Sequence, residues 1–406
     1  MSDRVKEIDL ILRLDEKNRK LLGDAQLLRA NRNKLSKEIE VLMAQKKPAE
    51  KLLLEAKKIP EKIKSIEDEQ KKIDEEIKSY LMRLPNLLHE SVPTGKSDAD
   101  NVVVRKHLEP KVPSYHLKHH GELAVELDGA DFERAVKVSG SGFYFLKNDL
   151  ALLDFALQQL AIKMLLAKGF SLIEVPFMVK RELYEGVTDF SDFENVMYKL
   201  EGTDLYLIAT SEHAIAPMFA GEILEESFLP QNFCGISSCF RKEVGKHGLD
   251  ERGLFRVHQF TKVEQFVFCK PQDSWKIHEQ LILNSESFLK ELGIPYQVVN
   301  VCTGDIGTVA AKKYDVNGWS PREKKFIELM SVSNCTTYQS RRLGIKFRLK
   351  NGEKDFVHTL NGTMVATSRL IRLILENFQT KEGSVLVPKA LQPYMNGLKE
   401  IKPKKH

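Results

Sequence analysis

The sequence has 406 residues, of which 62 are Lys or Arg and 57 are Asp or Glu, so its formal net charge is only +5. This length is enough for one large domain and a smaller one. Five cysteines without a Cys-x-x-Cys pair argue against a disulfide framework and a structural zinc site. No apolar run approaches the length of a membrane span, so we expect a soluble, cytoplasmic protein. The mild basic excess is compatible with a nucleic-acid partner but does not require one.

The first eighty residues carry a heptad pattern. Leucine recurs at every seventh position, at Leu14, Leu21, Leu28, Leu35 and Leu42. The positions three residues before these are partly polar, and they are Ile11, Asn18, Ala25, Arg32 and Ile39. After a break at Pro48, a second run with alternating spacings of four and three extends from Ile59 to Tyr80. Two such runs predict an antiparallel helical hairpin, with a restart or kink of the second helix at Pro60.

By itself, this pattern is more typical of a dimerisation coiled coil or a helical spacer than of a binding arm. Asn18 and Arg32 would make a poor seam in a parallel dimer, whereas two runs of similar length in one chain can cover each other. Basic side chains also cluster on the first run, at Arg29, Arg32, Lys34 and Lys37. Such side chains on a rigid arm suit contacts with the phosphates of a nucleic acid, which position it without reading its sequence.

A change of composition separates the helical pattern from the rest of the chain. Residues 84–96 contain prolines and a glycine, and residues 97–100 are polar and acidic. Both features are typical of a linker. We therefore predict two domains, which comprise residues 1–96 and 97–406.

The second domain begins with a predicted helix and strand. Residues 150–169 show an amphipathic pattern closed by Gly169, which predicts a helix with a C-terminal glycine. Residues 170–179 predict a strand. Pro176 interrupts it, which indicates an edge strand or a bulge.

A short apolar run, residues 205–209, predicts a buried strand that leads directly to Thr210, Ser211 and Glu212. Two hydroxyls and a carboxylate at a strand end suit the ammonium group and small polar side chain of an amino acid. The same residues are equally typical of a helix N-terminus, ahead of a helix over 213–224. The two interpretations are compatible, and the residues alone favour neither.

The most informative stretch follows. Residues 233–240 and 254–268 predict two antiparallel strands joined by a Gly-rich, charged loop over 245–253. We expect Arg241 and Glu243 to share one face of the first strand, because strand side chains repeat every second residue. A row of charged side chains on one sheet face is costly to bury unless a ligand satisfies it.

Polar residues also mark a third predicted strand, residues 326–339, which contains Glu328 and Ser331. Cys335 has no base nearby, and we interpret it as a packed strand residue.

Small residues and an arginine dominate the last informative segment. Gly362, Thr363 and Ala366 are predicted at a helix start, where they allow the helix to pack closely on a sheet. Arg369 lies one turn beyond Ala366, on the same side. Taken alone, this pattern is more typical of a buried helix with a surface arginine.

Together these segments resemble the class II aminoacyl-tRNA synthetases, and most specifically the seryl-tRNA synthetases. The similar strings are Phe-Arg-x-Glu from Phe240, Phe-Arg-Val-His-Gln-Phe from Phe255 and Lys-Val-Glu from Lys262. The resemblance extends to the amino-terminal helices, which in this family grip the long variable arm of tRNA-Ser. It implies an α+β fold, with an antiparallel helical hairpin before a mainly antiparallel sheet flanked by helices.

The resemblance also implies a serine–tRNA ligase, which activates L-serine with ATP to seryl-adenylate and transfers the seryl group to the 3′ end of tRNA-Ser. It makes Arg241 and Arg369 catalytic, on the α- and γ-phosphates, and it makes Glu328 and Ser331 ligands of Mg²⁺. The implied serine contacts are Thr210, Ser211, Glu212, Arg241, Glu264 and Thr363. The implied ATP contacts are Arg241, Lys242, Glu243, Val257, His258, Gln259, Phe260, Glu328, Leu329, Met330, Ser331 and Arg369. The family further implies a homodimer.

Two other functions stay open at this point. A paralogue that loads a small amino acid onto a carrier protein would not need the basic arm, and a catalytically silent RNA-binding protein would not need the polar residues of the predicted site. The heptads begin almost at once, whereas the family usually has a short leader before its arm. The sequence leaves open the roles of His247 and His258 and the charging of a selenocysteine tRNA.

Overall fold

The computed structural model describes residues 2–190, 194–243 and 253–404. It divides into two compact units, Met1–Leu84 and Pro85–His406. Asn86, just beyond the first unit, donates its amide to the carbonyl of Thr308 within the second (2.7 Å). The domain boundary that the sequence predicts, after residue 96, stays a prediction.

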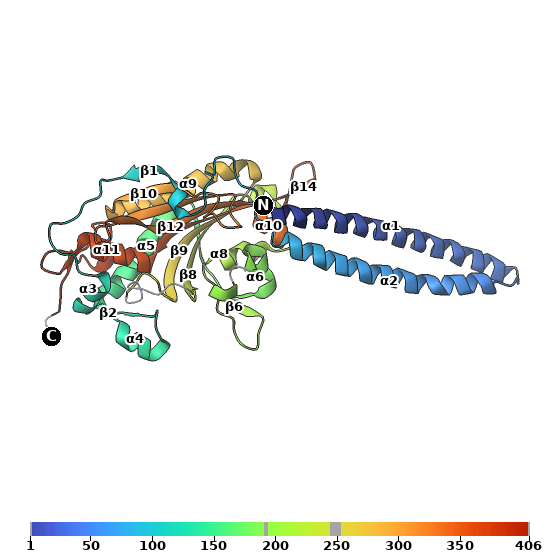
Figure 1. The fold of residues 1–406 in the computed structure, drawn as a ribbon, viewed down its shortest axis with the longest axis horizontal. Helices are drawn as coiled ribbons and strands as arrows, with labels where there is room; N and C mark the ends of the chain where they lie inside the picture. Colours follow the sequence, from blue (N-terminus) through green and yellow to red (C-terminus); the bar gives the residue numbers. More distant parts are fainter. Residues whose placement is uncertain (1, 191–193, 244–252, 405–406) are drawn as a thin grey trace. The chain divides into compact units, whose positions relative to one another are not determined.

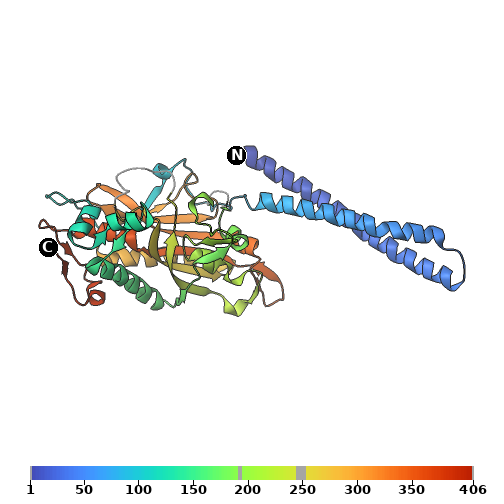
Figure 2. The same ribbon diagram turned by 90° about the horizontal axis from the view of Figure 1, so that it is seen from below.

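The first unit is the expected helical hairpin. Helices α1 (Ser2–Ala44) and α2 (Glu50–Leu81) lie side by side and run in opposite directions (Figures 1 and 2). Their seam buries Leu35 against Ile59 and Ile63, with other apolar side chains around them. The predicted restart of the second helix at Pro60 is wrong, because α2 begins before this proline and continues through it. Burial of the neighbouring isoleucines offsets the hydrogen bond that proline cannot make.

Polar pairs also join the two helices. Asn18, at a heptad position where an apolar residue is usual, donates to Asp74 (2.6 Å). Arg29 donates to Glu67 (2.7 Å) and is therefore engaged within the hairpin. Its charge is partly neutralised before any nucleic acid arrives.

The second unit is built on a sheet of eight strands in the order β1-β10-β11-β12-β15-β9-β8-β4. Neighbouring strands are antiparallel, except β4 and β8, which are parallel. In chain order the strands are β1 (Val102–His107), β4 (Ser171–Glu174), β8 (Gln231–Phe240), β9 (Gln259–Cys269), β10 (Tyr296–Asn300), β11 (Lys312–Ser320), β12 (Lys325–Thr336) and β15 (His358–Ala366). This is the mainly antiparallel sheet that the sequence predicts.

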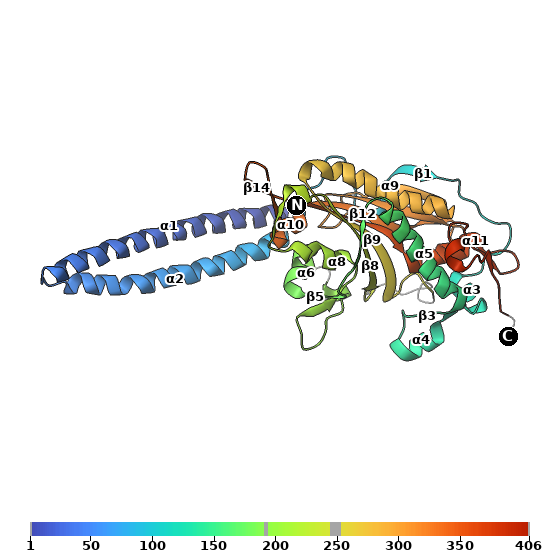
Figure 3. The ribbon, with the colours of Figure 1, turned by 180° about the vertical axis from the view of Figure 1, so that it is seen from behind.

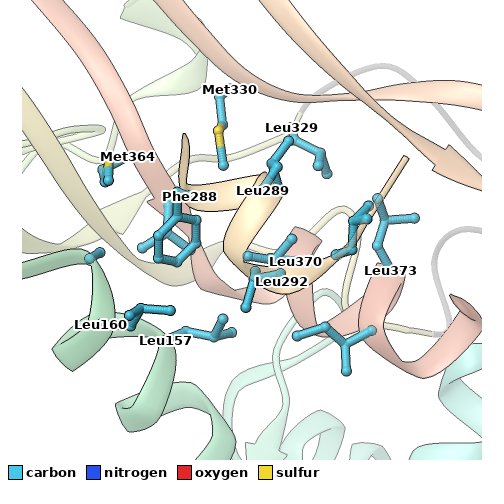
Figure 4. Packing of buried hydrophobic residues seen from close by; sticks show 14 of the residues in the cluster. Leu157, Leu160, Phe288, Leu289, Leu292, Leu329, Met330, Met364, Leu370 and Leu373 are labelled. Carbon is cyan, nitrogen blue, oxygen red and sulfur yellow. The ribbon is translucent and has the colours of Figure 1, made fainter. Parts of the chain in front are cut away.

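Three helices cover one face of this sheet (Figures 1 and 3). They are α5 (Asn148–Leu166), α9 (Ser274–Leu292) and α11 (Thr367–Phe378). Their apolar side chains meet those of the sheet in the main core, where Leu157 of α5, Phe288 of α9 and Leu370 of α11 belong to one cluster with Met364 of β15 (Figure 4). Helices α9 and α11 are amphipathic in sequence, whereas α5 carries apolar side chains on more of its surface. Burial of apolar side chains is what fixes each helix to the sheet.

Smaller elements complete the second unit. They are α3 (His120–Glu126), β2 (Ala130–Asp131), α4 (Phe132–Ser139), β3 (Phe145–Leu146), β5 (Met178–Lys180), α6 (Arg181–Val187), β6 (Leu205–Leu207), α8 (Glu212–Ile215), β7 (Ile223–Glu225), α10 (Tyr338–Leu343), β13 (Lys346–Arg348), β14 (Lys354–Phe356), β16 (Val385–Leu386) and β17 (Glu400–Ile401). Tyr184 of α6 and Tyr206 of β6 pack with Phe266 and Phe268 of β9 in a second apolar cluster. This cluster lies on the face of β9 opposite the main core, because Val263 and Val267 of the same strand belong to that core.

Several predicted elements differ from the structure. The strand predicted over 170–179 is divided at Pro176 into β4, at the edge of the large sheet, and β5, in another sheet. The helix predicted over 213–224 is reduced to the four residues of α8, followed by a 3-10 turn. Gly362 lies within β15 and not at a helix start, and α11 begins only after the strand. A Cβ atom at Gly362 would lie 3.2 Å from Val332 of β12, so a larger residue there would require Val332 to shift slightly.

The hairpin of β8 and β9 is also shorter than predicted. Arg241 and Glu243 follow the end of β8, and Glu243 has a φ of 46°, so the alternation of strand side chains does not apply to them. Strand β9 begins at Gln259, and not at Leu254, because the intervening backbone bonds to other segments. The amide of Leu254, for example, donates to His120 Nε2 (3.1 Å). Most of the predicted loop, with His247, lies outside the described residues.

Candidate active site

A cavity of about 590 Å³ lies over the sheet face that carries Glu264. Among the residues implied by the sequence, eleven line it, namely Thr210, Glu212, Arg241, Glu243, Phe260, Glu264, Glu328, Leu329, Ser331, Thr363 and Arg369. They come from strands β9, β12 and β15, from α8 and α11 and from the connections at their ends. Arg241 and Arg369, which are far apart in sequence, thus face one space.

The acidic end of the cavity is built around Glu264, whose side chain is buried in β9. One carboxylate oxygen, Oε2, accepts hydrogen bonds from the hydroxyls of Thr210 and Ser211 and from the amide of Glu212. The other, Oε1, lies 2.7 Å from the ammonium group of Lys262. Burial opposes ionisation, but the Lys262 charge and these hydrogen bonds hold the pKa of Glu264 below its usual value.

The hydroxyls of Thr210 and Ser211 therefore do not cap helix α8, which has no side-chain cap. The helix-cap interpretation is therefore wrong, and a role of these residues in binding an amino acid stays a prediction. These hydrogen bonds to Glu264 fix the position of residues 210–211 relative to β9.

Glu212 is the second carboxylate of the acidic end. Gln339 of α10 donates to its Oε1 (2.7 Å). Burial and the negative charge of Glu264 raise the pKa of Glu212 to about 7, although Lys262 acts in the opposite direction. The two carboxylates thus behave as a pair in which Glu264 is the more readily ionised.

The basic end of the cavity contains Arg241 and Arg369. Arg241 lies over the ring of Phe260, with its guanidinium carbon 5.2 Å from the ring centroid, and its Nε contacts the carbonyl of Ala209 (3.4 Å). Arg369, in the first turn of α11, lies over the ring of Phe255 (5.3 Å). Each guanidinium group lies against an aromatic face, and Arg369 also donates from one terminal nitrogen to the carbonyl of Glu328 (3.3 Å). The planar fork of a guanidinium group matches phosphate oxygens.

Glu328 lies between these two ends on β12. Its Oε1 accepts from the Ser331 hydroxyl (3.2 Å) and lies 3.6 Å from Arg369. Burial opposes ionisation, but Arg369 and then Lys313 hold the pKa of Glu328 below its usual value. Burial, together with the charge of Glu328, raises the pKa of nearby Asp315 to about 7. Two carboxylates of adjacent strands thus lie together next to the space between the arginines.

The other implied residues lie outside the cavity lining. Met330 and Val257 are buried, with Met330 in the main core, so any nucleotide contact from Met330 would have to come from its main chain. His258 stacks on Phe143 (5.2 Å) and bonds to Tyr198, and Lys242 lies over the Tyr198 ring. Gln259 is exposed, and Ser211 reaches only Glu264.

Sequence analysis missed Lys262, Asn361 and the segment 305–310, all of which line the cavity. Lys262 had a usable signal, because it precedes Glu264 by two residues and so shares its face of the strand. Residues 305–310 form no helix or strand, and nothing in their composition places them beside β12.

Comparison with known families agrees with this arrangement. Residues 196–378 match the family model of the tRNA synthetase class II core domain (G, H, P, S and T). Residues 2–88, which include both helices of the hairpin, match the model of the seryl-tRNA synthetase N-terminal domain. The fold and the cavity therefore define a class II aminoacyl-tRNA synthetase, a ligase that joins an amino acid to tRNA.

Individual relatives narrow this class. The chain is 54% identical to the serine–tRNA ligase of Methanocella arvoryzae over 97% of its own length and 93% of that protein. It superimposes on the seryl-tRNA synthetase of Pyrococcus horikoshii, solved in complex with ATP, with a TM-score of 0.93 and 46% identity, covering 99% of this chain and 95% of that one. It also superimposes on the serine–tRNA ligase of Naegleria fowleri, solved in complex with AMP, with a TM-score of 0.87 and 38% identity. That comparison covers 99% of this chain and 93% of the other. The chain belongs to the seryl-tRNA synthetase family.

Two further properties concern the described residues alone. Every helix that the structure describes is too short or too polar to cross a lipid bilayer. Across the same residues, no three His, Cys, Asp or Glu side chains gather as a metal site.

Proposed function

We propose that the cavity forms seryl-adenylate from L-serine and ATP, and that the seryl group then passes to the 3′ end of tRNA-Ser. The observation that carries this proposal is the meeting of Arg241 and Arg369 in the same cavity as Glu212 and Glu264. Guanidinium groups recognise phosphates, and carboxylates recognise an ammonium group, so one cavity offers partners for both substrates.

In the first step, a carboxylate oxygen of serine attacks the α-phosphorus of ATP, the bond to the bridging oxygen breaks and pyrophosphate leaves. In the second, a ribose hydroxyl of the tRNA attacks the seryl carbonyl, AMP leaves and the hydroxyl proton passes to solvent. Neither step needs a covalent bond to the protein. Catalysis therefore rests on orientation and on stabilisation of charge that develops on the phosphates.

The side chains have distinct roles in this scheme. Arg241 binds the α-phosphate and the serine carboxylate, and Arg369 binds the γ-phosphate. Phe260, which already stacks under Arg241, presents its ring to the adenine, and Glu243 orients the nucleotide. Arg241 contacts the carbonyl of Ala209 (3.4 Å), and Arg369 lies 3.6 Å from Glu328 Oε1, beside the proposed cation site.

Mg²⁺ fits the residues beside Arg369. Glu328 and Ser331 would hold it together with phosphate oxygens, since Mg²⁺ usually binds one or two carboxylates and completes its shell from substrate and water. Buried Oδ1 of Asp315, next to this pair, has no hydrogen-bond partner among the described residues, as expected beside a cation site. When bound, the ion would neutralise charge on the triphosphate.

Selection of serine depends on its hydroxyl group. Thr363, buried on β15 and paired with Glu264 in the sheet register, places a hydroxyl in the cavity. A site built to bond a hydroxyl rejects alanine, because its own polar groups would be left unpaired. Threonine would have to place an additional methyl group against β15.

The experiment that tests the proposal is amino-acid-dependent ATP–pyrophosphate exchange. We expect exchange with serine and at least about a hundredfold less with alanine at equal concentration. Exchange that depends on another amino acid would contradict the proposal. So would the absence of serine-dependent exchange both with and without tRNA-Ser.

Two partners and a location complete the proposed function. The hairpin binds tRNA-Ser through Arg32, Lys34 and Lys37 of α1, whose charges suit phosphate contacts. A second copy of the chain covers the exposed apolar side chains of α5 and edge strand β4, where Phe155 is 59% and Leu172 47% exposed. The site of action is the cytoplasm, where this reaction supplies translation.

The dimer has its own test. We expect light scattering to give twice the mass of one chain, and Leu172→Asp to give a monomer, since an aspartate cannot be buried at an apolar interface without cost. Val136→Asp, at an exposed position on α4, serves as the matched control. A monomeric parent chain would contradict the proposed dimer.

A further inference from the structure

A lysine that the proposed reaction does not use lies at the acidic end of the cavity. Lys262, on β9, is only 7% exposed. Its Nζ is 2.7 Å from Glu264 Oε1 and 3.0 Å from the Thr210 hydroxyl. A buried ammonium group carries a large desolvation cost, so a lysine in this place needs a reason beyond packing.

The contacts of Glu264 give that reason. Its Oε2 already accepts from Thr210, from Ser211 (3.0 Å) and from the amide of Glu212 (3.2 Å), while its Oε1 accepts from Lys262. Both oxygens are therefore engaged before any substrate binds. Glu212, in contrast, lines the same cavity without a cation in hydrogen-bond contact among the described residues.

We propose that Lys262 is a positioning residue, which neutralises Glu264 and so leaves the charge of Glu212 to receive the ammonium group of serine. The inference rests on the proposed function and deepens it, because it assigns a different role to each of the two carboxylates. Glu264 holds residues 210–212 in register and keeps its own ion partner. Glu212 then supplies the single net negative charge that one ammonium group requires.

The other titratable groups around Glu212 and Glu264 do not supply the positive charge that Lys262 supplies. From α8, His213 is neutral, since burial lowers its pKa to about 3. From β8 and β12, Cys239 and Cys335 are uncharged thiols, since burial raises the pKa of both. Burial also raises the pKa of Tyr184 of α6. Arg241 is the other cation nearby, and it contributes to the fields around His213 and Tyr184, but the proposed reaction commits it to phosphate.

Removing the lysine should therefore change the titration of the pair. Lys262 lowers the pKa of both Glu212 and Glu264, so without it two buried carboxylates share the site and retain one proton to higher pH. A proton bound there competes with the ammonium group of serine. Serine binding would then improve only as pH rises far enough to remove that proton.

The test compares Lys262→Met with the parent enzyme in serine-dependent ATP–pyrophosphate exchange from pH 6 to pH 8. For the parent, we expect the KM for serine to fall as pH rises through about 7, when Glu212 gains its charge. For Lys262→Met, the midpoint of this change moves upward by at least about one pH unit, which makes the serine KM about tenfold higher at pH 7. The KM for ATP changes by less than about threefold.

Three more variants make the test specific. Lys262→Arg keeps the charge and restores the parent midpoint, whereas Lys262→Gln keeps a hydrogen-bond donor without charge and behaves as Lys262→Met does. Either neutral variant suffices if the other fails to fold. Lys313→Met is the matched control, because this lysine lines the same cavity but lies beside Asp315 (3.9 Å), so its loss leaves the serine midpoint unchanged.

An unchanged midpoint in both neutral variants would overturn the inference. So would an equal rise of the KM values for serine and ATP, which would indicate a general structural role. Absence of serine-dependent exchange in the parent enzyme is a different result, and it would count against the proposed function instead.

Discussion

The helical hairpin and the sheet unit are stabilised in different ways. In the hairpin, the best-buried cluster is Leu35, Ile59 and Ile63, and exposed ion pairs such as Arg29–Glu67 cross between the helices. In the sheet unit, three helices share one core, and even charged groups such as Arg372 and Glu376 are buried together. The hairpin shows how far a local repeat can build a long element with little core. The sheet unit shows what a buried, polar active site requires around it.

The largest expected effect separates the two units by function. Deletion of residues 15–78 should lower aminoacylation of tRNA-Ser by about a thousandfold or more, because several phosphate contacts are lost at once. Serine-dependent ATP–pyrophosphate exchange should be retained, since the cavity belongs wholly to the second unit. Radiolabelled serine transfer and exchange, measured on one preparation, check this. Equal loss of both would show that the units are not separate.

Arg241→Ala should have the opposite effect, a loss of exchange with retained binding of tRNA-Ser. It should lower kcat/KM for exchange by about a hundredfold to a thousandfold, the usual effect of losing a group that stabilises charge in a transition state. Binding of tRNA-Ser, measured by filter retention, should be unchanged. Arg241→Lys keeps the charge but not the planar fork and should recover only part of the activity. Exchange that is unaffected by Arg241→Ala would refute the phosphate assignment.

A pair of core substitutions compares stability. Phe288→Ala should cost about 3–5 kcal/mol of unfolding free energy in the sheet unit, because the surrounding side chains cannot collapse into the space. Leu35→Ala should cost about 2 kcal/mol, at the low end for leucine, since only one neighbouring helix surrounds the site. Urea unfolding followed by circular dichroism should show separate transitions. A larger cost for Leu35→Ala would contradict the contrast between the units.

Acid should act on the sheet unit through Glu376. Burial opposes ionisation, but His120, Arg372 and Ser320 lower the pKa of Glu376 to about 2. A lowered carboxyl pKa stabilises the fold above the unfolded value of 4.5, and the benefit is lost as pH falls through about 2. Glu376→Gln should therefore cost about 3 kcal/mol at pH 7, and the difference from the parent should shrink between about pH 5 and pH 2.

Thermal unfolding at several pH values measures this difference. Glu382→Gln, an exposed carboxyl group in the same unit, is the control and should change stability by no more than about 0.5 kcal/mol. A constant difference between Glu376→Gln and the parent across this range would show that the network does not depend on the charge.

The smallest expected effect lies on the surface of the hairpin. Arg29→Gln should change its stability by less than about 1 kcal/mol, as is usual for an exposed ion pair. Lys37→Gln should reduce the salt dependence of tRNA-Ser binding by about one unit of the logarithmic slope, whereas Arg29→Gln should reduce it less because Glu67 already engages this arginine. Equal reductions of the slope by Lys37→Gln and Arg29→Gln would show that the ion pair with Glu67 does not limit the contribution of Arg29 to tRNA binding.

Much of the fold could be predicted from local pattern. The heptads predict both hairpin helices, because an isolated pair of helices is held by the side chains that repeat along them. The conformation of residues near the ends of strands was harder to predict from the sequence. Gly362 and Thr363 were assigned to a helix start, yet they lie inside β15, because small residues also serve a central strand that packs closely on its neighbours. Ala366, at the end of β15, does lie at the start of α11.

The candidate site divides in the same way. Arg241, Glu264, Glu328 and Arg369 were found through motif strings, which carry information about distant partners that a single pattern lacks. Lys262 was missed, although it lies between known candidates, because a lysine in a strand is usually interpreted as solvent-exposed. Its hydrogen bond to the Thr210 hydroxyl exists only because a segment remote in sequence lies beside β9.

The sequence by itself determined the two-part organisation, the helices of the hairpin and the identity of the charged residues that converge. These properties depend on spacing along the chain, where periodicity and composition act directly. Only the tertiary structure decided which carboxylate is paired, which arginine is engaged and which strand ends early. Those outcomes depend on burial, on charge–charge distance and on backbone partners supplied by remote segments, and none of these is a property of the local sequence.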